Sequence, residues 1–173
     1  MNSKRFSYIY ILRHGIAVER GTSGLQKDQD RPLTPKGRRQ LRRITRVMKA
    51  LGVSFDLILS SPYLRARQTA EIVAKAFKAQ KRLVLSDTLA ADRDPKDVIK
   101  SLQHLDPRPE SVLLVGHEPY LSELISRLVA GNSSCAVELK KGGLARLEVA
   151  SLKAKRCAIL QWLLTPRQMM LMD

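Results

Sequence analysis

The sequence has few cysteines, few aromatic residues and no long apolar run. Its 173 residues include 2 Cys, and Cys135 and Cys157 stand far apart without C-x-x-C spacing. This argues against a disulfide scaffold or a zinc ribbon and favours a reducing compartment. No apolar run approaches the roughly 18 residues that a membrane-spanning helix needs. The first one is broken at once by Arg13 and His14, unlike a signal peptide. The sequence therefore predicts a cytoplasmic protein without a membrane partner.

Acidic residues are also scarce. The chain has 16 Asp and Glu against 31 Lys and Arg, a formal net charge of +15. Such an excess fits either a polyanionic partner or a basic host proteome. Aromatic residues make up only 5% and do not alternate with basic ones, so a nucleic-acid partner is not expected. The densest basic stretch, 36–49, has apolar residues at helical spacing, and its charges are interpreted as a solvated helix face. A basic polyanion-binding module without catalysis is the alternative from another class.

Short β-rich apolar runs alternate with segments of helical periodicity along most of the chain. Strands are expected at 8–12, 55–59, 83–85, 112–115 and 158–164, and helices from Pro35, Leu64, Asp94 and Pro119. Between Gly131 and the last strand, 136–139 and 144–149 are expected to form a hairpin or a tight strand connection. This order predicts an α/β fold in which residues 1–173 form a single three-layer domain. Its central sheet is mostly parallel, with helices on both faces and an antiparallel C-terminal addition.

Three of the expected strands end in polar, reactive residues. Arg13 and His14 follow the first strand, Arg65 lies beyond the second, and His117 follows the fourth. The carboxyl ends of parallel strands meet at one edge of a sheet, where ligands bind in open α/β folds. Two guanidinium groups and two imidazoles with few carboxylates suit a dianion, above all a phosphoryl group. Arginine pairs with phosphate oxygens in a planar, bidentate manner, and histidine can act as nucleophile or proton carrier.

Three motifs at these strand ends carry a more specific signal. They are L-R-H-G at 12–15, S-S-P-Y-L-R-A-R-Q-T-A at 60–70 and V-G-H-E-P at 115–119. In this order they resemble three signatures of the histidine phosphatase (phosphoglycerate mutase-like) superfamily. The resemblance extends from Tyr8 to Leu164. The short chain, the D-R-P-L-T segment at 30–34 and the lack of cap insertions make it most similar to the SixA phosphohistidine phosphatases.

The resemblance implies a metal-independent phosphatase without a cofactor. His14 would attack phosphorus and carry the phosphoryl group until water releases inorganic phosphate. Arg13, Arg65 and His117 would surround the equatorial oxygens. Attack requires an unprotonated ring nitrogen, so the other nitrogen of His14 is expected to donate to a backbone carbonyl. The expected substrate is phosphohistidine on a partner protein. The alternative within the superfamily is a small-molecule phosphomonoesterase that acts on a phosphorylated metabolite.

Three further residues are expected to contact the substrate. Gly15 would let the backbone approach the phosphate closely. Ser61 would bind phosphate or cap the following helix, and Glu118 would line the site. Whether the 16–31 loop closes on binding is left open.

The sequence departs from the superfamily at the leaving-group acid. Many members carry a glutamate two residues after a leucine beyond the third strand, where this chain has Ala91. Without a strong proton donor, an alkoxide departs slowly. A phosphoramidate depends less on such a donor, since its imidazole leaves neutral once protonated. The departure therefore favours phosphohistidine, with Asp92 or Glu118 as candidate substitute donors.

Overall fold

The computed structural model describes residues 8–21, 24, 27–152 and 156–173. Across these residues six strands form one sheet in the order β3-β2-β4-β1-β5-β6. The strands are β1 (Tyr8–Arg13), β2 (Leu57–Ser60), β3 (Leu83–Leu85), β4 (Ser111–Gly116), β5 (Leu144–Val149) and β6 (Ala158–Leu164). The helices are α1 (Pro35–Ala50), α2 (Leu64–Ala76), α3 (Pro95–Gln103), α4 (Tyr120–Ala130) and α5 (Pro166–Leu171). Short 3₁₀ helices lie in the connections: η1 (Asp28–Asp30), η2 (Gln80–Arg82) and η3 (Asp87–Leu89).

The sheet is parallel on one side and antiparallel on the other. β4 pairs parallel with β1 and with β2, and β2 pairs parallel with β3. On the other side, β5 pairs antiparallel with β1, and β6 pairs antiparallel with β5. All six residues of β4 are buried, as expected of a strand covered on both faces. The predicted fold class is confirmed: a mostly parallel α/β sheet with an antiparallel C-terminal addition.

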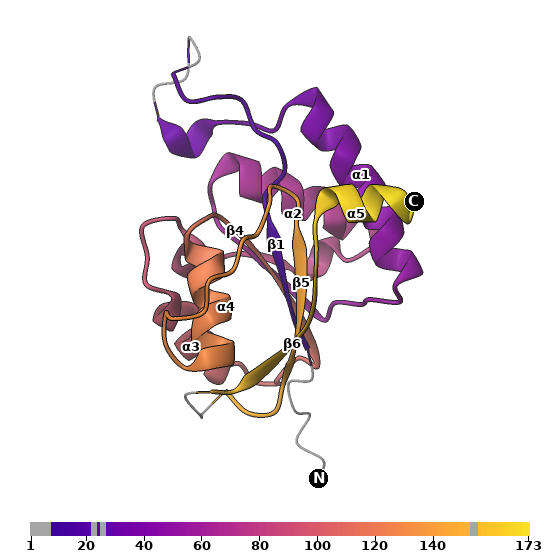
Figure 1. The fold of residues 1–173 in the computed structure, drawn as a ribbon. Helices are drawn as coiled ribbons and strands as arrows, with labels where there is room; N and C mark the ends of the chain where they lie inside the picture. The colour runs from indigo at the N-terminus through magenta and orange to yellow at the C-terminus, as the bar shows by residue number, and fades with distance from the viewer. Residues whose placement is uncertain (1–7, 22–23, 25–26, 153–155) are drawn as a thin grey trace.

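Helices cover both faces of the sheet (Figure 1), which gives the three predicted layers. α3 and α4 pack on one face, where their apolar side chains join β1, β4 and β5 in one core cluster. α1, α2 and α5 cover the other face and form a second cluster around Leu113 and Phe55. Because helices pack on both faces of the sheet, the loops at its carboxyl edge are held on a rigid support.

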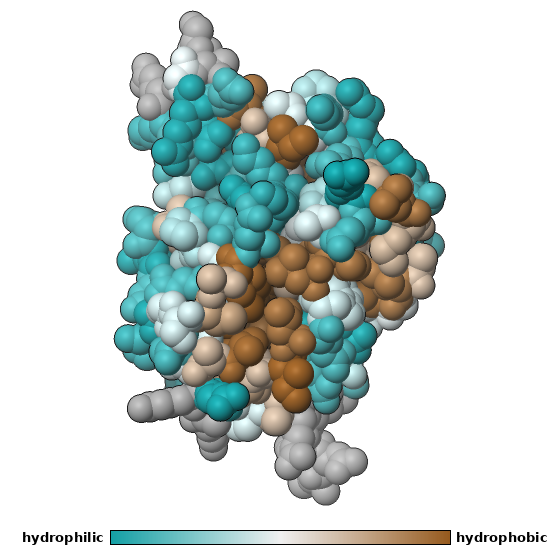
Figure 2. All heavy atoms as spheres, in the orientation of Figure 1, coloured by the Kyte–Doolittle hydropathy of each residue, from teal (hydrophilic) through white to brown (hydrophobic). Residues whose placement is uncertain are grey.

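α1 shows how local sequence sets one of these layers. The Thr34 side chain accepts a hydrogen bond from the Gly37 N–H, and Pro35 occupies the first turn, so the helix starts where the sequence predicts. It ends before Gly52, which adopts a left-handed φ of 67°. Leu41, Ile44 and Met48 are buried, as the predicted spacing requires. The basic residues between them form a hydrophilic surface, in contrast to a hydrophobic strip along β6 (Figure 2).

The predicted hairpin of 136–139 with 144–149 is wrong. Residues 136–139 form no strand, and β5 pairs with β1 and β6 instead. The G-G pair at 142–143, predicted to lie in the hairpin turn, hydrogen-bonds to the end of β1 instead. The Gly142 N–H donates to the carbonyls of Arg13 and His14, and the Gly143 carbonyl accepts from the Arg13 N–H. Gly142 has a φ of 80°, a conformation that glycine adopts without strain.

Candidate active site

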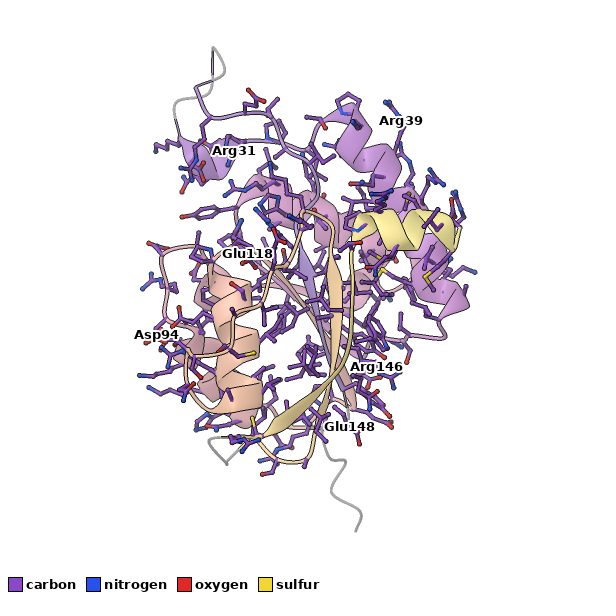
Figure 3. All side chains as sticks on the ribbon, viewed as in Figure 1. Arg31, Arg39, Asp94, Glu118, Arg146 and Glu148 are labelled. Atoms are coloured by element: carbon purple, nitrogen blue, oxygen red, sulfur yellow. The ribbon has the colours of Figure 1, made fainter. Side chains whose placement is uncertain are left out.

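The three reactive segments meet at the carboxyl edge of the sheet. Within the sheet Arg13 is in register with Gly116, and Ser60 with Val115, so β1, β2 and β4 end together. The ring centroids of His14 and His117 are 5.2 Å apart. Figure 3 shows Glu118 and Arg31 toward this end of the molecule and Arg146 and Glu148 toward the opposite end. The predicted convergence of distant segments is therefore present.

His14 is a buried, neutral imidazole with a fixed tautomer. Its Nδ1 lies 2.7 Å from the Gly15 carbonyl oxygen. A carbonyl only accepts, so Nδ1 carries the hydrogen and Nε2 presents its lone pair. This lone pair accepts a hydrogen bond from Nε of Arg65 at 3.2 Å. Burial lowers the pKa of His14 to about 2, and the cations around it act in the same direction. The expected backbone carbonyl partner is confirmed.

His117 is held by a serine from the second motif. Its Nε2 lies 2.8 Å from Ser61 Oγ, which also accepts a hydrogen bond from the Tyr63 N–H. Burial, reinforced by Arg65, lowers the pKa of His117 to about 3. Either atom of this pair can donate, so the contact fixes the orientation of the ring and not its tautomer. Nδ1 of His117 is buried and has no hydrogen-bond partner in the described part of the chain.

Two arginines bring positive charge to the site. Arg65 is only 3% exposed although it begins a helix. Arg13 ends β1, and its Nη1 donates to the Leu139 carbonyl at 2.9 Å. Its Nε is buried and lacks a partner among the described residues. Burial lowers the pKa of each guanidinium. Removing a charged group from water is costly, so the placement of both arginines indicates a role other than stabilising the fold.

Sequence reasoning missed the acidic partner of Arg65. The Asp28 carboxylate accepts from Arg65 Nη2 at 2.9 Å, and the Asp28 carbonyl accepts from Arg65 Nη1 at 2.7 Å. Arg20 and Arg31 donate to the other carboxylate oxygen. Burial works to raise the pKa of Asp28, but Arg65, Arg31 and Arg20 outweigh it and lower the pKa to about 2. The only available signal was D-Q-D-R at 28–31 inside a polar loop.

Gly15 has no room for a side chain. A Cβ at this position would lie 2.7 Å from Cδ1 of Leu41 and 3.3 Å from Cδ2 of Leu33. The Gly15 N–H donates to Thr69 Oγ1, which in turn donates to the Arg65 carbonyl. Thr69, in the second motif, thus links the loop after β1 to α2. Its role was not foreseen.

The two candidate proton donors lie in different surroundings. Glu118 is half-buried and accepts a hydrogen bond from the Ser122 N–H at 3.1 Å. Burial raises the pKa of Glu118, against an opposing effect from Arg13. Asp92 is exposed and lines a cavity of about 440 Å³ beside Tyr63. In the described residues no hydrogen bond or ion pair connects Asp92 with His14.

Neither a metal-binding cluster nor a membrane-crossing helix is found among the described residues. In that part of the chain no group of three or more His, Cys, Asp or Glu could hold a metal ion. Over the same residues, no helix has the length and apolar character needed to cross a membrane.

Fold and site together define a class: an α/β protein whose sheet edge brings together two buried, neutral histidines, a buried arginine and a half-buried one. Comparison with known proteins identifies the family. The model of the histidine phosphatase superfamily (branch 1) matches residues 9–90. Phosphohistidine phosphatase SixA of Escherichia coli (strain K12) is 31% identical over 126 residues, 72% of this chain and 76% of the relative. The chain belongs to the histidine phosphatase superfamily.

Other relatives agree with this assignment. An uncharacterized protein of Picosynechococcus sp. (strain ATCC 27264 / PCC 7002 / PR-6) is 37% identical over 140 residues, 80% of this chain and 83% of the relative. The structure of the protein histidine phosphatase SixA complexed with tungstate has a TM-score of 0.79 and 25% identity, covering 92% of this chain and 97% of that chain. A putative SixA from Agrobacterium tumefaciens has a TM-score of 0.74 and 25% identity, covering 92% and 98%. The fold is SixA-like.

Proposed function

We propose that this protein is a metal-independent phosphatase that removes the phosphoryl group from phosphohistidine on a partner protein and carries it on His14. The observation that carries the proposal is the geometry of His14. Its Nδ1–H is fixed by the Gly15 carbonyl, and its Nε2 lone pair meets the buried guanidinium of Arg65. A neutral imidazole with one committed nitrogen is a prepared nucleophile, and a neighbouring fixed cation suits a dianionic electrophile.

The reaction proceeds in two displacements. In the first, Nε2 of His14 forms a bond to phosphorus while the phosphorus–nitrogen bond of the substrate breaks, and the departing imidazole gains a proton. In the second, water attacks the phosphorylated His14, releases inorganic phosphate and restores the neutral ring. Each step spreads negative charge over the three equatorial oxygens, which fixed positive groups stabilise.

Two buried nitrogens without a partner support the binding of such an anion. Nε of Arg13 and Nδ1 of His117 have no partner in the described chain. An unsatisfied buried polar group costs about 1–3 kcal/mol, and phosphoryl oxygens would remove that cost. The structural similarity to a SixA solved with tungstate, another tetrahedral oxyanion, points the same way. Arg13, Arg65 and His117 are therefore assigned to the equatorial oxygens.

The leaving group separates the proposal from its alternative, a small-molecule phosphomonoesterase. Ala91 stands where many superfamily members carry the acidic proton donor. An alkoxide leaves slowly without such a donor, whereas a protonated imidazole leaves as a neutral molecule. Glu118, with its raised pKa and half-buried carboxyl, is the better placed of the two substitute donors.

The test compares two peptides of the same sequence, one with phosphohistidine and one with phosphoserine, at equal concentrations. We expect kcat/KM for the phosphohistidine peptide to exceed that for the phosphoserine peptide by about 100-fold, a margin typical of lost acid catalysis. A His14→Ala enzyme controls for spontaneous hydrolysis of the phosphoramidate. A preference for phosphoserine or for a phosphosugar would contradict the proposed substrate.

A further inference from the structure

Asp28 holds Arg65 from two directions. The carboxylate oxygen Oδ2 accepts from Nη2, and the backbone carbonyl accepts from Nη1. The third nitrogen of the guanidinium, Nε, donates to His14. Every nitrogen of Arg65 therefore has a partner, and two of the three partners belong to Asp28. The direction in which Nε points at the nucleophile is set by a single aspartate.

The same carboxylate neutralises part of the positive charge of the site. Its other oxygen accepts from Nε of Arg31 at 2.9 Å and from Nε of Arg20 at 2.8 Å. The Arg31 side chain is 13% exposed and that of Arg65 is 4% exposed, whereas that of Asp28 is 34% exposed, so solvent screens these pairs in part. The Arg20 side chain is 80% exposed, and its pair with Asp28 contributes little.

We propose that Asp28 is a positioning and specificity residue: its carboxylate is a built-in counter-anion that aims Arg65 at His14 and disfavours substrates with a second anionic group beside the transferred phosphoryl group. This inference rests on the proposed function. A single phosphoryl group can use the remaining N–H bonds of Arg65 while Asp28 keeps its contacts. A second phosphate or carboxylate close by meets the fixed negative charge of Asp28 and is repelled.

The inference names a substrate class. Phosphohistidine carries one dianion on an uncharged ring and has no second anionic group for Asp28 to repel. Bisphosphates and phosphorylated carboxylic acids carry a second anion and are disfavoured. The counter-anion thus separates a protein-borne phosphoramidate from many phosphorylated metabolites, independently of the missing leaving-group acid.

The test uses Asp28→Asn in the full chain. The amide oxygen can still accept from Arg65 Nη2, but the negative charge is gone. The matched control is Asp30→Asn, which makes the same change of charge in the same 3₁₀ helix. Asp30 is exposed and forms no ion pair with another described residue. Binding of inorganic phosphate and of pyrophosphate is measured by calorimetric titration, and kcat and KM are measured with the phosphohistidine peptide.

We expect Asp28→Asn to bind phosphate about threefold and pyrophosphate about tenfold more tightly than the original chain. Pyrophosphate gains more because it carries more negative charge, which Asp28 no longer repels. KM should fall because the phosphoryl group no longer meets the negative charge of Asp28. kcat should also fall, because Arg65 is less firmly aimed at His14. Asp30→Asn should resemble the original chain. A merely structural role for Asp28 would not raise the ratio of pyrophosphate to phosphate affinity.

A second variant, Asp28→Glu, keeps the charge but lengthens the side chain. It should retain the original ratio of affinities and lose kcat. The inference would be overturned if the ratio of pyrophosphate to phosphate affinity were equal in Asp28→Asn and Asp30→Asn. It would also be overturned if Asp28→Asn did not fold and Asp28→Glu raised that ratio. Such a result leaves the phosphatase proposal standing. Undiminished turnover by His14→Ala, in contrast, would refute the phosphatase mechanism itself.

Discussion

Arg65 donates a hydrogen bond from its Nε to the Nε2 of His14 across 3.2 Å. Nδ1 of the same ring is committed to the Gly15 carbonyl, so this contact marks the lone pair available for attack. It also places a guanidinium where the charge of a transferring phosphoryl group would develop. The first turn of a helix is unfavourable for a cation, because the helix dipole is positive there. Arg65 occupies that position almost fully buried, which a purely structural role does not explain.

Replacement of Arg65 by alanine should lower kcat/KM by about 100- to 1,000-fold, the usual loss when a fixed stabilising donor is removed. The measurement is steady-state hydrolysis of the phosphohistidine peptide. Arg67→Ala is the matched control, since Arg67 lies in the same helix, is exposed and pairs with Glu71. Equal losses in the two variants would argue against a specific role for Arg65.

Replacement of Ser61 by alanine should release His117 from its orientation. The ring loses the partner of Nε2, and kcat is expected to fall about tenfold, as for a removed positioning hydrogen bond. Nitrogen NMR of the labelled imidazole reports the tautomer of the ring in both proteins. Ser60→Ala provides the comparison, because Ser60 is also buried but its hydroxyl bonds only the Ser61 carbonyl among described residues. An unchanged His117 spectrum in Ser61→Ala would contradict the positioning role of Ser61.

The two buried histidines should make the fold sensitive to mild acid. Their pKa values, about 2 and about 3, lie below the unfolded value near 6.5. The unfolded chain therefore binds more protons between these limits, and the free energy of unfolding falls as pH drops below 6.5. From pH 7 to pH 5 the loss should be about 2 kcal/mol for each histidine. Above pH 7 these two groups contribute no further change.

Urea unfolding at pH 7 and pH 5 measures this loss. From pH 7 to pH 5, His14→Gln should lose about 2 kcal/mol less stability than the original chain, whereas His104→Gln, at an exposed site, should lose as much as the original chain. The lowered pKa of Asp28 acts only below about pH 4, outside this window. Equal pH dependence in all three proteins would show that the site histidines are not held neutral.

Removal of metal ions should leave turnover intact. The proposed mechanism gives the role of a phosphate-neutralising cation to Arg13, Arg65 and His117. Dialysis against a chelator is therefore expected to change kcat by less than about twofold, because no step of the proposed reaction uses a metal ion. The same assay after addition of magnesium serves as the comparison. A loss of activity that magnesium restores would contradict a metal-independent reaction.

Much of the fold could be predicted because its signals are local. The alternation of apolar runs with helical periodicity gave the parallel part of the sheet, and Thr34, Pro35 and Gly52 marked the ends of α1. α5 was missed although Thr165 and Gln168 form a capping box at its start. A helix of six residues has too few apolar positions to show a period.

The residues that failed prediction depend on contacts between distant segments. The G-G pair at 142–143 has the chemistry of a hairpin turn, but its partner is the end of β1, which local sequence does not reveal. Asp28 lies in a polar loop, and only the folded chain brings it to Arg65. The reactive residues themselves were predictable, since each directly follows or lies near a strand end in a parallel sheet.

The most direct test of the central claim is to capture the phosphorylated enzyme. Labelled phosphohistidine substrate is mixed with the protein, the reaction is quenched without acid, and peptides are mapped. The account predicts one acid-labile, alkali-stable phosphoryl group on His14, absent from His14→Ala. A label on another residue, or turnover without any labelled enzyme, would contradict it.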